Sequence, residues 1–257
     1  MRRWGTLLLA LVLTSGCGGG GTTASPSTPA GTPAPTVSPS PSGPKLLGCP
    51  QGPEVPLTTH VVTAPGGQPF AVGVAGDGPV AVVVANTLVG HLCDWLPWVQ
   101  DLTKRGYRAA IFDYSFIPTQ VGIPAAVGKG SSDLVAVAGK LEELGAQKVV
   151  YAGGSLGGSV ALNAATRDNA DPAGVIVLSG GLPELEKEAA SLKVPVVYAV
   201  AEDDYGAYNT AKALSKVTKD ATLKVYPGAA HANEMFRVPS YAPKLQNALA
   251  AFLKDLG

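Results

Sequence analysis

The stretch that decides the fold reads Tyr151-Ala152-Gly153-Gly154-Ser155-Leu156-Gly157-Gly158. It follows the apolar run 148–150, which is typical of a short buried strand, and it precedes a segment that favours a helix. Gly153 and Gly157 flank Ser155 two positions away on either side, so the strand and helix backbones can nearly touch in a very tight turn. Such a turn holds the serine hydroxyl out at the carboxyl edge of a parallel sheet. It also directs the first amides of the helix toward the space beside that hydroxyl.

The motif alone has limited weight. The chain holds 32 glycines in 257 residues, so chance would produce a Gly-x-Ser-x-Gly pattern about 0.2 times in such a chain. A glycine-rich turn with a solvated serine is the alternative interpretation. The surrounding sequence has to decide between the two.

Short apolar runs recur along the chain and predict strands at 60–64, 70–74, 80–85, 108–112, 148–151, 174–178, 194–200 and 222–226. The first two runs flank Pro65-Gly66-Gly67, which predicts an antiparallel hairpin. Segments with helical spacing cover 96–105, 134–144 and 241–256, the second capped by Ser132-Asp133 after an irregular loop at 114–130. This alternation predicts an α/β fold, a mostly parallel sheet of about eight strands with helices on both faces.

Two further groups with suitable chemistry follow predicted strands. Asp203 and Asp204 follow the strand 194–200 after Ala201-Glu202, and His231 lies in the loop after 222–226. An acid can hold a histidine in one tautomer, and the histidine can then act as the base that a serine nucleophile needs. Because ligands bind at the carboxyl ends of parallel strands, the sequence predicts a nucleophilic site at that edge of the sheet.

The order serine, acid, histidine on strand ends, with Gly-x-Ser-x-Gly at a strand–helix turn, resembles the α/β-hydrolase superfamily. The resemblance covers roughly 55–257 and is strongest to compact enzymes of the dienelactone-hydrolase and carboxylesterase types. It implies that Ser155 is the nucleophile, His231 the base and Asp204 the acid, with Asp203 as the alternative acid.

The same resemblance implies an oxyanion hole built from two backbone amides. One belongs to Leu156, the residue after the nucleophile. The other lies in the loop after the strand 80–85, where Thr87 aligns best. This loop reads Ala85-Asn86-Thr87, whereas many members of the superfamily have His-Gly there.

Other polar and aromatic residues near this edge have simpler interpretations. His91 could touch substrate, but a solvated or capping role is expected. Asp113 is expected to shape loops, and Trp95 and Trp98 to pack in the core. The segment 179–193 is too short for a cap domain, which favours an open site acting on small soluble esters or exposed acyl groups.

The N-terminal sequence predicts two segments before the folded domain. Residues 1–17 resemble a bacterial lipoprotein signal, in which Cys17 would be lipidated after cleavage. Residues 18–45 consist of Gly, Ser, Thr and Pro with little else, which predicts a disordered tether. The hydrolase domain would then occupy 46–257, held at the extracytoplasmic face of the bacterial cell membrane by the lipid anchor only.

Cysteine use is consistent with that compartment. If Cys17 carries lipid, Cys49 and Cys93 remain as a pair, and in an oxidising space they could form a disulfide. Two buried free thiols are the alternative.

Composition excludes several classes of function. The formal net charge is zero and no basic block is present, so nucleic acid is not expected as a partner. No Cys/His cluster has metal-ligand spacing, and we expect no metal or other cofactor. The sequence predicts an extracytoplasmic serine hydrolase acting on a small-molecule ester, in an oligomeric state left open. A non-catalytic binding domain and an acyltransferase or peptidase are the alternatives.

Overall fold

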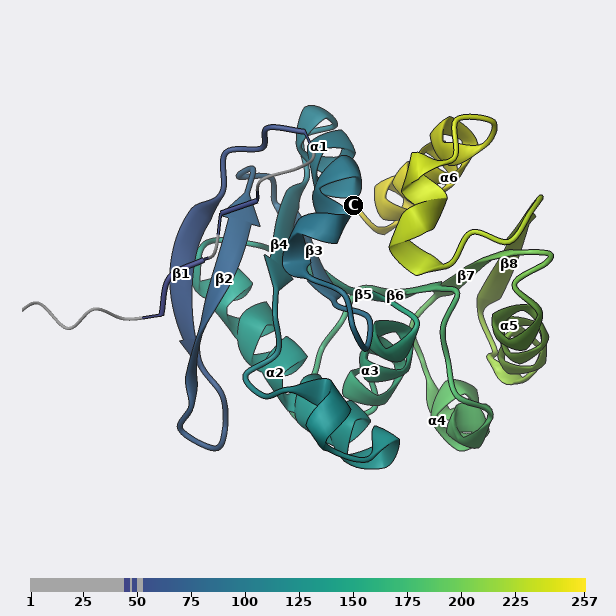
Figure 1. Ribbon diagram of the computed structural model, residues 1–257, viewed down its shortest axis with the longest axis horizontal. Coiled ribbons are helices and arrows are strands. Elements are labelled where there is room, and N and C mark those ends of the chain that lie inside the picture. The colour runs from purple at the N-terminus through teal and green to yellow at the C-terminus, as the bar shows by residue number, and fades with distance from the viewer. Residues whose placement is uncertain (1–43, 47, 50–52) are drawn as a thin grey trace, which may run out of the picture. The chain divides into compact units, whose positions relative to one another are not determined.

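The computed structural model describes residues 44–46, 48–49 and 53–257 (Figure 1). The predicted signal peptide and all but the last two residues of the predicted tether lie outside the described residues. The centre of the fold is an eight-stranded sheet with the strand order β1-β2-β4-β3-β5-β6-β7-β8. Its strands are β1 Thr58–Thr63, β2 Pro69–Ala75, β3 Val80–Ala85, β4 Arg108–Phe112, β5 Lys148–Gly154, β6 Gly174–Leu178, β7 Val196–Ala201 and β8 Ala221–Tyr226.

The sheet is mostly parallel. β1 pairs antiparallel with β2, and β2 pairs antiparallel with β4, whereas every remaining neighbour pair runs parallel. The predicted fold class and the predicted hairpin are therefore confirmed. Strand order reverses at β3, which lies between β4 and β5. The chain segments leaving β3 and β5 consequently diverge, which opens a crevice at the carboxyl edge between them.

Helices cover both faces of the sheet (Figure 1). The α-helices are α1 Leu96–Lys104, α2 Ile123–Glu143, α3 Leu156–Ala164, α4 Glu186–Ser191, α5 Tyr205–Val217 and α6 Ala242–Leu256. Four short 3₁₀ helices join them, η1 Leu92–Trp95, η2 Pro118–Gln120, η3 Pro183–Leu185 and η4 Ala232–Arg237. One apolar core joins the sheet to α2, α3, α4 and α5, and a second joins the opposite face to α1 and α6.

The central strands are apolar on both sides because both faces are covered. Every residue of β3 and β7 is buried, in line with the continuous apolar runs that such strands contain. This rigid centre carries the turns that follow β3, β5 and β7.

The prediction for the middle of the chain was wrong in one respect. Helix α2 begins at Ile123, so residues expected to form an irregular loop are helical, and Ser132-Asp133 lies inside the helix rather than at its start. Asp133 accepts hydrogen bonds from the Ser115 amide and hydroxyl, both at 2.9 Å. Gly130 is needed within the helix because a Cβ there would lie 2.8 Å from Val160 and 2.9 Å from Tyr114.

In the part of the chain that the structure describes, no helix combines the length and the apolar character needed to cross a bilayer.

Candidate active site

The turn between β5 and α3 holds Ser155 in an unusual backbone conformation. Its φ is 55° and its ψ is −120°, in a region that residues other than glycine seldom adopt. The Ser155 amide donates to the carbonyl of Leu178 at 3.0 Å, which ties the turn to the end of β6. The strain is therefore held in place by neighbouring strands, as is common at functional sites.

The two flanking glycines are required by close backbone approach. A Cβ at Gly153 would collide with the Gly157 carbonyl, and a Cβ at Gly157 would collide with the carbonyl of Ala85 at the end of β3. The expected tight turn is confirmed. It brings the end of β3, the end of β5 and the start of α3 together beside Ser155.

A histidine–carboxylate pair lies at the ends of the next strands. Nδ1 of His231 is 2.7 Å from Oδ2 of Asp204. Asp204 precedes α5 and its side chain is only 17 % exposed, whereas the His231 side chain is 42 % exposed. The imidazole is therefore held by a mostly buried carboxylate while part of its ring stays accessible.

Asp203 has a different role in the same turn. Its amide donates to the carbonyl of Gly228 at 2.9 Å, and its side chain is on the exposed surface. Ala201 is the buried last residue of β7 and pairs with Tyr226. Alanine therefore fits the turn, and Asp204 is the carboxylate that contacts the histidine.

Ser155 and His231 border one cavity of about 350 Å³. Its wall also includes Leu156 from α3, Leu88 from the loop after β3, and Ser179 and Leu182 from the loop after β6. Most of these neighbours are apolar or small. The polar side chains of Ser155 and His231 are therefore surrounded by a largely apolar wall.

The loop after β3 corrects one sequence expectation. The Thr87 amide donates to the side-chain Oδ1 of Asn86 at 2.8 Å, so this amide is occupied within its own loop. Leu88, one residue further on, is the loop residue that borders the cavity. The Leu88 amide has no hydrogen-bond acceptor among the described residues.

Asn86 is fixed by contacts from several elements. Its Oδ1 also accepts from Trp95 Nε1 at 3.1 Å, and its Nδ2 donates to Asp113 Oδ1 at 3.0 Å. The Tyr114 hydroxyl donates to the Asn86 carbonyl at 2.7 Å. Burial raises the pKa of Tyr114, and the nearby Asp133 charge raises it further, so this hydroxyl stays a neutral donor.

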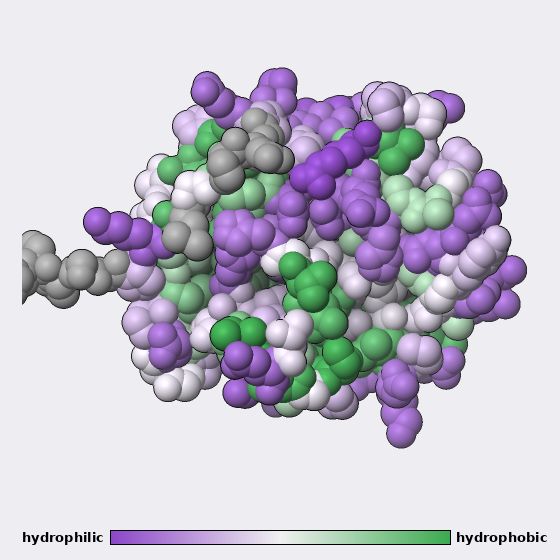
Figure 2. All heavy atoms as spheres, viewed as in Figure 1, coloured by the Kyte–Doolittle hydropathy of each residue, from purple (hydrophilic) through white to green (hydrophobic). Residues whose placement is uncertain are grey.

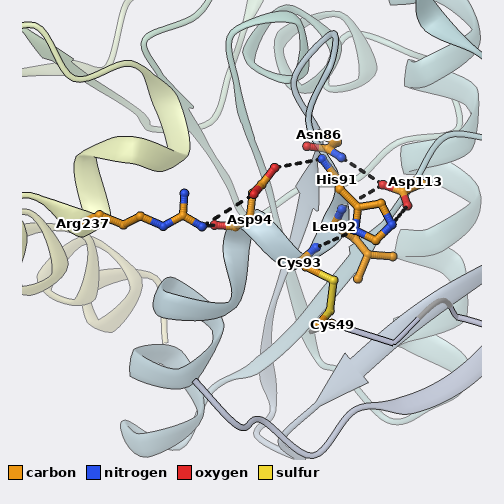
Figure 3. The surroundings of a disulfide bond; sticks show 8 residues. All are labelled: Cys49, Asn86, His91, Leu92, Cys93, Asp94, Asp113 and Arg237. Atoms are coloured by element: carbon orange, nitrogen blue, oxygen red, sulfur yellow. Dashed lines mark hydrogen bonds and ion pairs between the residues drawn. A yellow bond between two sulfur atoms is a disulfide. The ribbon is translucent and has the colours of Figure 1, made fainter. Parts of the chain in front are cut away.

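His91 serves this loop as a cap, as expected, and Figure 3 shows its neighbours. Its Nδ1 accepts from the Cys93 amide at 3.3 Å and its Nε2 lies 3.0 Å from Asp113 Oδ2. Asp113 also accepts from the Leu92 amide at 2.8 Å, which confirms its loop-shaping role. Trp95 and Trp98 are almost fully buried, as core packing requires.

A disulfide joins Cys49 to Cys93 in η1, across a sequence separation of 44 (Figure 3). Asp94, the next residue, accepts from Arg237 of η4 through its carbonyl at 3.3 Å. The segment after β3 is thus connected covalently to the start of the domain and by a polar contact to the helix after His231.

The loop after β6 was missed as part of the site. Ser179 is buried with a φ of 45°, and Gly180 passes so close to Ser155 that a Cβ there would lie 2.8 Å from the Ser155 carbonyl. The signal for this loop was the sequence Ser179-Gly180-Gly181 directly after a predicted strand, which indicates a close backbone approach.

The model of the dienelactone hydrolase family matches residues 77–249, which is more than half of the chain. The chain belongs to the dienelactone hydrolase family. Membership indicates hydrolase chemistry on esters and agrees with the position of Ser155 and the His231–Asp204 pair at the carboxyl edge of the sheet.

Solved structures with the same fold have low sequence identity. An esterase from Exiguobacterium antarcticum has a TM-score of 0.62 and 14 % identity, over 77 % of this chain and 100 % of that one. A dienelactone hydrolase from Anabaena variabilis has a TM-score of 0.64 and 16 % identity, over 78 % and 98 %. A monoacylglycerol lipase from Paleococcus ferrophilus has a TM-score of 0.59 and 18 % identity, over 73 % and 99 %. No curated protein sequence matches the chain.

Proposed function

We propose that this dienelactone-hydrolase family member is a serine hydrolase that cleaves carboxylic esters through Ser155, His231 and Asp204. The contact of 2.7 Å between His231 Nδ1 and Asp204 Oδ2 carries the proposal. It leaves Nε2 as the nitrogen that can exchange a proton, in a cavity that Ser155 also borders. A serine at positive φ that borders the same cavity as such a pair supports nucleophilic catalysis by Ser155.

The reaction then runs in two halves. His231 Nε2 accepts the Ser155 proton as Oγ bonds to the ester carbon, and the imidazolium returns that proton to the departing alcohol. An acyl-enzyme remains. Water attacks it with His231 again as the base, which releases the carboxylic acid and restores Ser155.

Two backbone amides are proposed to stabilise the oxyanion. Leu156 is the first residue of α3, and the first amides of a helix have no acceptor in a preceding turn. The second donor is the amide of Leu88 rather than that of Thr87, because the Thr87 amide already bonds to Asn86 Oδ1 at 2.8 Å. Each such donor contributes about 10²- to 10³-fold to kcat in comparable enzymes.

The direct test is hydrolysis of p-nitrophenyl butanoate by wild type and Ser155→Ala. We expect the variant to lose about 10⁴-fold or more of kcat, and the wild type to label with a fluorophosphonate probe while the variant does not. Equal rates of ester hydrolysis by wild type and Ser155→Ala would contradict the proposal. Failure of folded wild type to label would favour a non-catalytic binding domain. An added alcohol that captures the acyl group faster than water does would indicate acyl transfer.

We further propose that the domain acts outside the cytoplasm on a lipid anchor at Cys17. The Cys49–Cys93 disulfide supports an oxidising compartment. Metabolic labelling with a radioactive fatty acid checks the anchor: label should enter wild type and be absent from Cys17→Ser.

A further inference from the structure

We propose that the cavity at Ser155 continues into an apolar groove that receives an elongated, uncharged substituent of the ester. This proposal rests on the proposed function and defines its substrate class. The groove has a volume of about 570 Å³ and lies between the start of α2 and the segment Leu182–Leu185. Figure 2 shows apolar side chains gathered in the lower middle of this face.

The groove adjoins the cavity because two residues border both. Ile123 at the start of α2 and Leu182 after β6 line the cavity of Ser155 and also the groove. Beyond them the groove is lined by Val127, Leu185 and Pro124, with the neutral side chain of Asn163 from α3 at its border. A chain attached to the reacting carbonyl group can therefore leave the cavity past Ile123 and Leu182 and remain in contact with apolar side chains.

The charges around the groove favour an uncharged chain. Glu184 and Glu188 border it, and none of the described residues that line the groove or the cavity is a lysine or an arginine. Arg167 is not among the lining residues, and its guanidinium donates to the Gly128 carbonyl at 2.6 Å and to the Ser132 hydroxyl at 2.9 Å. A substituent ending in a carboxylate would meet two acids of the same sign, with no lysine or arginine among the described lining residues to balance them.

The glycines of α2 supply a matched pair of variants. Gly128 borders the groove, and a Cβ built there meets no atom within 4 Å, so Gly128→Leu adds an apolar side chain to open space. Gly139 lies in the same helix with equally open surroundings but away from the groove. Both changes raise helix propensity, so both variants are expected to fold.

The first experiment measures kcat/KM for two ester series, one with acyl groups of four to eight carbons and one with alcohols of four to eight carbons. In wild type and Gly139→Leu, one series should rise about two- to four-fold per methylene. The series that rises identifies which side of the ester occupies the groove. Gly128→Leu should abolish that rise, whereas Gly139→Leu should keep it. A rise in Gly128→Leu equal to that of Gly139→Leu would overturn the proposal, as would no rise in either series of an active wild type.

The second experiment does not depend on catalysis. Calorimetry on the Ser155→Ala background compares octanamide, butanamide and the monoamide of suberic acid, which ends in a carboxylate. Octanamide should bind more tightly than the other two, and adding Gly128→Leu should remove the difference. If wild type cleaves no ester but this pattern is found, the hydrolase proposal fails and the groove stands. Equal binding of octanamide with and without Gly128→Leu overturns the groove.

Discussion

Nδ1 of His231 lies 2.7 Å from Oδ2 of Asp204, whereas the neighbouring Asp203 has an exposed side chain and uses its amide to hold the Gly228 carbonyl. Asp204 therefore orients the imidazole. We expect Asp204→Asn to lower kcat by about 10³- to 10⁴-fold, because an amide at this position favours the wrong tautomer. Asp203→Asn is the matched control and should stay within a few-fold of wild type. Steady-state kinetics on a p-nitrophenyl ester compare the kcat values of the two variants. A larger loss of kcat in Asp203→Asn than in Asp204→Asn would assign the acid to Asp203.

The backbone N–H proposed as a donor at Leu88 can be removed by a substitution at that position alone. Proline at 88 has no amide hydrogen, so Leu88→Pro should lower kcat by about 10²- to 10³-fold. Leu88→Ala keeps the amide and should retain kcat with a changed KM, because Leu88 also borders the cavity. Circular dichroism checks that the proline variant is folded. Similar kcat for folded Leu88→Pro and Leu88→Ala would rule the donor out.

The disulfide should contribute substantially to stability. Opening a loop with a sequence separation of 44 is expected to cost roughly 4 kcal/mol of unfolding free energy on loop-closure entropy alone. We expect Cys49→Ser/Cys93→Ser to show this loss in urea unfolding, and wild type to match it in the presence of a reductant. Because Cys93 lies in η1, close after Leu88, kcat/KM should fall as well. An unfolding midpoint unaffected by reductant would contradict the prediction.

Asp133 should make stability depend on pH. Burial raises the pKa of its carboxyl, while hydrogen bonds from Ser115 lower it by less. A carboxyl with a raised folded-state pKa binds more protons in the native than in the unfolded state, so its contribution to stability falls as pH rises between the unfolded and folded pKa values. Asp133→Asn removes this titration. The stability deficit of the variant should therefore be larger at pH 4 than at pH 7 in urea unfolding, and a deficit that grows toward pH 7 would refute the assignment.

The parts of the candidate site that the sequence could indicate depend on local patterns. Apolar runs of strand length end a few residues before Ser155, before the pair Asp203-Asp204 and before His231. In a parallel sheet such run ends meet at one edge. The flanking glycines Gly153 and Gly157 indicated the turn because a side chain at either position would collide with nearby backbone. The colliding carbonyl lies within the motif for Gly153 and at the end of β3 for Gly157.

What was missed depends on contacts between distant residues. Helix α2 extends through Gly128 and Gly130 because Gly130 packs against Val160 and Tyr114, although these glycines locally suggest a loop. The occupancy of the Thr87 amide follows from the orientation of the Asn86 side chain, which Trp95 and Asp113 hold. Neither partner is adjacent to Asn86 in sequence, so no local pattern distinguishes Thr87 from Leu88.

The Cys49–Cys93 bond also determines which part of the domain first bears a pulling force applied to the N-terminal segment. Tension applied to any part of the chain before Cys49 passes through the sulfur–sulfur bond directly to Cys93. The intervening residues, which include the edge strands β1 and β2 and the central strand β3, are thereby bypassed. A pull on the N-terminal segment would reach η1 without peeling the hairpin from the sheet, so the edge of the fold would resist forced unfolding for as long as the bond is intact.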